Sequence, residues 1–176
     1  MGVALRVASA SARRYSSTLR KDAVRLLSAM GLGRCELSII IVDDTTIQGL
    51  NREFRGKDSP TDVLSFSQVE EIEAAAPNPD KVPNAPQTIL GDVVISIDTA
   101  LAQASKYGVT RAARLRTLLI HGVLHLVGYD HERSPADARL MFARERELTS
   151  AIAAGARSKP ATKRKLKGPT RTRNSP

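Results

Sequence analysis

The sequence predicts an α+β fold, in which helices pack around one small, mixed β-sheet. Two observations support this prediction. Short runs rich in Val and Ile are interspersed with segments of helical period, and the order of these segments along the chain suits a single domain of packed layers. A chain of 176 residues is long enough to bury a sizeable core in one domain. It contains no internal repeat and no glycine-rich phosphate loop.

Four segments are predicted to be strands, because each is a short apolar run between turn residues. They are residues 3–7, 36–42, 63–67 and 89–97. Asp92, inside the last run, is expected to be a hydrogen-bonding carboxylate of a strand edge; the alternative is a neighbour of the functional site. Residues 70–88 contain three Glu, four Ala and four Pro, and are expected to form a solvated excursion without a core.

Five segments are predicted to be helices, from their apolar period and their end signals. They are residues 17–30, closed by Gly31; a helix capped by Asp44 or Thr45 with a stripe through Ile47, Leu50, Asn51 and Phe54, ended by Gly56; a helix capped by Asp98 that runs to Lys106; a helix capped by Thr110 and apolar from Leu118 to Val127; and a helix from Ser134-Pro135 to about Ala154. The fourth is nearly apolar all round, so it is expected to be central and buried, with one polar seam on a cleft.

All three histidines of the chain lie on that helix and just beyond it. His121 and His125 are one helical turn apart, so their rings project from one face. Gly128 favours a left-handed helix end, after which the chain can bring His131 back to the other two. The spacing His-x3-His-x2-Gly-x2-His is that of metzincin zinc sites, and three imidazoles leave a fourth position open for catalysis. We predict one zinc ion, although nickel, copper and iron(II) also suit imidazole ligands.

The formal net charge of +9 is concentrated at the two ends of the chain. Residues 157–176 contain eight Lys or Arg and no acid. We therefore divide the chain into a folded domain, residues 1–156, and a basic tail, residues 157–176, that is expected to be disordered. Such a tail adds salt-sensitive affinity for phosphate backbones; the alternative is a solubility tail.

The single cysteine, Cys35, excludes an intrachain disulfide and is expected to be a small buried hydrophobe. No apolar stretch has the length of a membrane span. The Arg- and Ser-rich start is similar in composition to an organellar transit peptide, but residues 3–7 are better interpreted as a first strand, so a cytoplasmic location is expected.

Three blocks of the sequence together resemble the YbeY family of bacterial endoribonucleases. They are the histidine stretch 121–131, the block Leu50–Phe66 that contains Arg55-Gly-Lys-Asp58, and Leu90-Gly-Asp92. The resemblance covers about residues 3–153. It implies a zincin-like α+β fold, one zinc ion on His121, His125 and His131, and cleavage of single-stranded RNA.

The resemblance also implies an arginine near the metal, which corresponds to Arg55. It implies action at the 3′ end of small-subunit ribosomal RNA precursors and in ribosome quality control, with the small ribosomal subunit as partner. Two features depart from the family pattern: Arg114 stands where an acidic residue is common, and the basic tail lies outside the family core.

The predicted reaction is attack of zinc-bound water on a phosphodiester. A guanidinium is planar, bidentate and always protonated, so Arg55 is expected to stabilise the charge on the phosphate, with Lys57 contacting the RNA backbone. No general base is evident. Asp130 is expected to orient a histidine, the alternative being that it caps the turn.

Two other functions are also compatible with the sequence. A metallopeptidase would suit the histidine spacing, but Gly122 occupies the position where zinc peptidases carry their glutamate base. A non-enzymatic, zinc-stabilised ribosome- or RNA-binding factor would suit the low aromatic content of 3%, which leaves few platforms for stacking bases.

Overall fold

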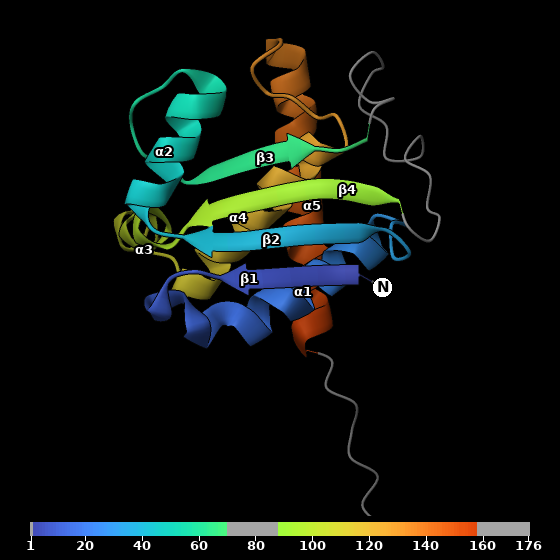
Figure 1. The fold of residues 1–176 in the computed structure, drawn as a ribbon. Helices are drawn as coiled ribbons and strands as arrows, with labels where there is room; N and C mark the ends of the chain where they lie inside the picture. The colour runs from blue at the N-terminus through green and yellow to red at the C-terminus, as the bar shows by residue number, and fades with distance from the viewer. Residues whose placement is uncertain (1, 70–87, 158–176) are drawn as a thin grey trace, which may run out of the picture.

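The structure, a computed structural model, describes residues 2–69 and 88–157, and its centre is a four-stranded mixed sheet (Figure 1). The strand order is β1-β2-β4-β3; β1, β2 and β4 are parallel, and β3 is antiparallel to β4. The strands are β1 (Gly2–Val7), β2 (Glu36–Val42), β3 (Val63–Ser67) and β4 (Ile89–Ser96). The predicted α+β class and mixed sheet are confirmed. The expectation for residues 70–88 concerns a segment that, except for Thr88, lies outside the described residues.

Within residues 2–69 and 88–157, five α-helices and one 3-10 helix accompany the sheet. They are η1 (Ala10–Tyr15), α1 (Ser16–Ala29), α2 (Asp44–Arg55), α3 (Ile97–Lys106), α4 (Arg111–Leu126) and α5 (Pro135–Arg157). The five predicted helices are confirmed, whereas η1 was not predicted. Helix α5 continues past Ala154 to Arg157, the first residue of the segment predicted to be the tail. No helix within residues 2–69 or 88–157 combines the length and the apolar character needed to cross a bilayer.

The predicted N-terminal caps of α2 and α3 are wrong by one and two residues. Asp43, not Asp44 or Thr45, caps α2, because its carboxylate accepts a hydrogen bond from the backbone N–H three residues later at 2.8 Å. Ser96, not Asp98, caps α3 in the same way. In both cases the residue directly before the helix supplies the cap, because its side chain already reaches a free N–H group of the first turn.

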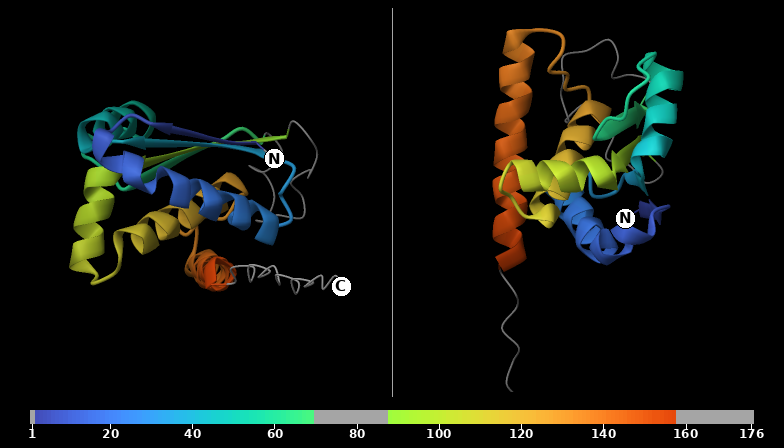
Figure 2. Two further views of the ribbon diagram at one scale, coloured as in Figure 1. Left: turned by 90° about the horizontal axis from the view of Figure 1, so that it is seen from below. Right: turned by 90° about the vertical axis from the view of Figure 1, so that its left-hand side faces the viewer.

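The helices are arranged unequally about the sheet (Figure 2). Helices α1 and α4 cover one face, and α5 packs on the outer side of this pair. Helix α2 lies on the opposite face, against β3 and β4. Helix α4 contacts β3, β4, α1, α3 and α5, so the predicted central position of this helix is confirmed.

The core lies mainly between α4 and the sheet. Eight residues of α4 are buried, including Leu119, Ile120 and Val123, which are fully excluded from solvent. Cys35 is buried as expected, and burial raises the pKa of its thiol. Asp92 accepts a hydrogen bond from the Gln68 side-chain amide at 3.1 Å, as favoured from the sequence, although β4 is an inner strand.

Candidate metal centre and cleft

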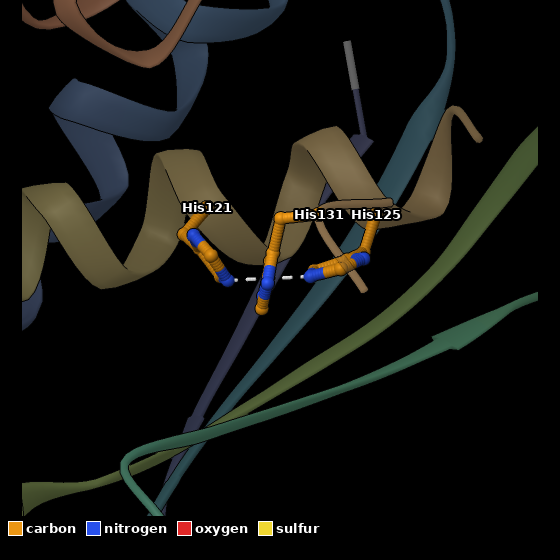
Figure 3. Close-up of side chains that lie close together, drawn as sticks. All are labelled: His121, His125 and His131. Carbon is orange, nitrogen blue, oxygen red and sulfur yellow. Dashed lines mark hydrogen bonds between the residues drawn. The ribbon is translucent and has the colours of Figure 1, made fainter. Parts of the chain in front are cut away.

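The three histidines converge at the C-terminal end of α4 (Figure 3). His121 and His125 project from the polar seam of α4, and Gly128 takes the left-handed conformation, with φ of 91°, that reverses the chain. His131 then returns toward the helix. One nitrogen of each ring can be chosen so that all three lie within 4.8 Å of one another. The predicted local geometry of the stretch is therefore present.

The spacing of the ring nitrogens fits a metal ion. The Nε2 atoms of His121 and His125 lie 3.2 Å apart. Two nitrogens that each bind zinc at about 2.0–2.1 Å with a tetrahedral angle are separated by about 3.3 Å. The cluster is thus compatible with a metal site that needs little rearrangement to close around an ion.

The surroundings of His125 favour its neutral form. Burial first, and then the neighbouring His121 and His131, lower the pKa of His125 to about 4. The imidazole is therefore neutral at pH 7, which metal binding requires.

Glu145 of α5 fixes the orientation of His121, and the sequence analysis missed this residue. Its carboxylate Oε2 lies 3.0 Å from His121 Nδ1, and both side chains are about one-fifth exposed, at 19% and 20%. Because a carboxylate can only accept, Nδ1 carries the proton, and Nε2 is left to face the cluster. No local pattern identifies Glu145, since it follows His121 by 24 residues and only the packing of α5 on α4 brings the two together.

Asp130 does not orient a histidine, so that prediction is wrong. Its carboxylate accepts from the backbone N–H of Glu132 at 2.8 Å and pairs with Arg133 Nε at 3.2 Å. The hydrogen bond from Glu132 is the main reason that the pKa of Asp130 is lowered. Asp130 therefore caps the turn that carries His131, while the His131 ring stacks on Phe142 with 5.7 Å between centroids.

The cluster opens on a cleft of about 720 Å³ between the end of α4, strand β3 and the loop that follows α2. Arg55 and Lys57 line this cleft together with the three histidines. Arg55 Nη2 pairs with the Glu132 carboxylate at 3.2 Å, across the mouth of the site. The structure thus brings Arg55, distant in sequence, to the same cleft as the histidines.

Side chains of helices α2 and α4 hold the loop after Arg55 in place. Asn51 Nδ2 donates to the Ser59 carbonyl oxygen at 2.8 Å. Asp62, which lines the cleft, pairs at 3.1 Å with Arg114, a residue of α4 that is only 17% exposed. Arg114 is therefore matched by an acidic partner in the loop.

Strand β3 lies close against α4 beside the cluster. The Ser65 hydroxyl donates to the Gly122 carbonyl oxygen at 3.0 Å, and the Ser67 hydroxyl donates to that of Leu126 at 3.1 Å. A Cβ atom at position 122 would stand 2.6 Å from Val93 Cγ1. The helix and the sheet are therefore too close for any side chain at this position, and a glutamate base cannot be accommodated there.

The protein is an α+β protein whose central helix presents a three-histidine cluster to an open cleft. The cluster is compatible with a metal ion. The model of the family described as Endoribonuclease YbeY matches residues 6–153. The chain belongs to the Endoribonuclease YbeY family.

Relatives agree with this assignment, and a solved structure agrees with the fold. An Endoribonuclease YbeY from Geobacter metallireducens is 50% identical over 131 residues, which are 74% of this chain and 81% of that protein. One from Roseiflexus sp. is 48% identical over 120 residues, 68% of this chain and 72% of that protein. A solution structure from Thermotoga maritima has a TM-score of 0.60 at 23% identity and covers 94% of this chain and 99% of that one, which supports the fold alone.

Proposed function

We propose that this protein is a zinc-dependent endoribonuclease that cleaves single-stranded RNA, acting in the cytoplasm on the 3′ end of small-subunit ribosomal RNA precursors and in ribosome quality control. The family supplies the reaction, since the relatives carry the name endoribonuclease. The observation that carries the proposal is the placement of the three histidines and Arg55 in one open cleft.

His121, His125 and His131 would hold the ion, and a set of three imidazoles suits zinc. A zinc ion bound there supplies Lewis acidity and a water molecule of lowered pKa. Glu145 keeps His121 in the tautomer that directs Nε2 to the cluster. The burial of His125 keeps protons from competing for its ring.

Arg55 would contact the reacting phosphate through its guanidinium, with Lys57 on the RNA backbone. In the structure Arg55 is paired with Glu132, and their side chains are 42% and 58% exposed. An ion pair this exposed contributes about 0–1 kcal/mol, so a phosphate can displace Glu132 at little cost. The guanidinium is then already positioned for the charge that develops on the non-bridging oxygens.

No general base is assigned among the described residues. Three acids line the cleft, and each accepts from a neighbour: Asp62 from Arg114, Asp130 from the Glu132 amide and Glu132 from Arg55. The residue at the position of the peptidase base is Gly122, and a Cβ atom there would stand 2.6 Å from Val93 Cγ1. The geometry therefore favours the nuclease over the metallopeptidase.

The test compares cleavage of a labelled single-stranded RNA, the same RNA in a duplex, and casein. The protein is stripped with a chelator, reloaded with zinc, and its metal content is measured in the same samples. We expect zinc-restored cleavage of the single strand alone. In His125→Ala, metal and cleavage should be lost together, and full metal occupancy there would contradict the three-histidine assignment. A metal-loaded protein that binds RNA without cutting it would identify a binding factor instead.

A further inference from the structure

The phenylalanines of this chain are gathered at the cleft. The chain has three Phe, three Tyr and no Trp. Phe54 and Phe66 line the cleft, and Phe142 stacks on His131 at its border. In a protein with so few aromatic residues, this distribution places every phenyl ring beside the candidate site.

Phe54 is the most exposed of these rings. The helical period puts it on the same stripe as Ile47, which is fully buried, yet Phe54 is 59% exposed. The apolar stripe of α2 is therefore exposed to solvent at its last position. The stripe extends beyond the contact between α2 and the sheet, so Phe54 lacks the stabilisation that full burial would provide. An exposed large apolar side chain in a functional cleft marks a surface that a ligand can cover.

The ring is held in place, and cations lie beside it. Phe66 meets Phe54 edge to face, with centroids 5.1 Å apart and planes at 71°, which restrains the ring without covering most of it. Arg55, the next residue, and Lys57 line the same cleft. A flat apolar surface next to two cations matches a nucleotide, which has a flat base beside an anionic phosphate.

We propose that Phe54 is a stacking platform for an unpaired nucleobase of the RNA, adjacent to the phosphate that Arg55 contacts. A base inside a duplex is covered on both faces by its neighbours, whereas an unpaired base can stack on an aromatic side chain. Phe54 thus makes the cleft selective for single strands. This inference rests on the proposed function and assigns part of its specificity to one residue.

The test uses the zinc-loaded full chain and a fluorescein-labelled single-stranded RNA. Anisotropy before turnover gives the dissociation constant, and products are analysed from the same samples. High salt suppresses non-specific binding through the basic tail. Phe54→Ala should weaken binding about 5- to 100-fold, the range for loss of one base–aromatic stack. Phe54→Trp should restore binding, and Phe54→Leu, which keeps the apolar surface without the aromatic face, should restore little.

Two controls localise the effect. Tyr107 is similarly exposed, at 54%, but does not line the cleft, so Tyr107→Ala should bind like the wild type. On the RNA side, an abasic nucleotide is moved along the strand. At one position it should weaken binding to the wild type but cause no further loss in Phe54→Ala, because the same stack is already missing.

The possible failures are distinguishable. Additive losses in Phe54→Ala at every abasic position, or full recovery in Phe54→Leu, would overturn the stacking role while cleavage by the wild type stands. A zinc-loaded wild-type protein that cuts no single-stranded RNA would overturn the proposed function, and this inference with it. Because Phe54 is exposed, the melting temperature of Phe54→Ala should stay close to that of the wild type.

Discussion

Replacing Arg55 tests its role in stabilising the phosphate charge, because the substitution should change neither the metal site nor the fold. The side chain is 42% exposed and its ion pair is with Glu132, itself 58% exposed, so Arg55→Ala should lower the free energy of unfolding by at most about 1 kcal/mol. Zinc content should not change, because no histidine of the cluster is bonded to Arg55. Cleavage should fall by about 10²- to 10³-fold, or roughly 2.7–4 kcal/mol, the usual effect of removing one preorganised donor.

The matched control is Arg52, one turn earlier on the same helix. It forms a comparable exposed pair with Asp58, at 3.6 Å, and does not line the cleft. Arg52→Ala should therefore cleave like the wild type. Arg55→Lys should recover only part of the activity, because an ammonium keeps the charge but not the bidentate geometry.

The assay is single-turnover cleavage of one single-stranded RNA by the wild type and the three variants, with zinc and melting temperature measured on the same preparations. Near-wild-type cleavage by zinc-loaded Arg55→Ala would show that Arg55 does not stabilise the charge on the phosphate. Arg55 would then be a structural residue of the loop. A loss equal to that of Arg52→Ala would refute the stabilising role as well, since it would point to general electrostatic attraction.

Three further predictions follow from the site and the charge distribution. Glu145→Gln should weaken zinc binding about 10- to 100-fold in competition with a chromogenic chelator, because the hydrogen bond to His121 loses its charge; unchanged affinity would show that the contact is dispensable. In the metal-free protein, the pKa of His125 is lowered to about 4 from an ordinary value of 6.5, so between these pH values the unfolded state binds more protons than the folded state. The free energy of unfolding should therefore be highest above pH 6.5 and fall as the pH is lowered toward 4. In thermal melts, His125→Ala should lose less stability than the wild type over the same pH range. Deleting residues 158–176 removes seven Lys or Arg and should weaken RNA binding with a flatter salt dependence, whereas an identical salt slope would assign the tail another role.

The four strands, the five α-helices and the spacing of the three histidines could be predicted from the amino-acid sequence. The segments 36–42 and 63–67 form β2 and β3 with the predicted bounds, because a short apolar run between turn residues has few alternatives to a strand. The turn of helix between His121 and His125, and the left-handed Gly128 after it, are equally local. These features depend on residues within a few positions of one another, so their pattern is visible in the chain itself.

Only the tertiary structure decided which distant side chains meet. The packing of α5 on α4 pairs Glu145 with His121, and the chain reversal at Gly128 brings Glu132 to Arg55. The packing of α2 on the sheet leaves Phe54 59% exposed, although Phe54 follows the same helical period as the buried Ile47. Helical period states which residues share a face, but not how far the partner surface extends beneath that face. That extent depends on how α2, α4 and the sheet pack together. The same packing sets which side chains line the cleft.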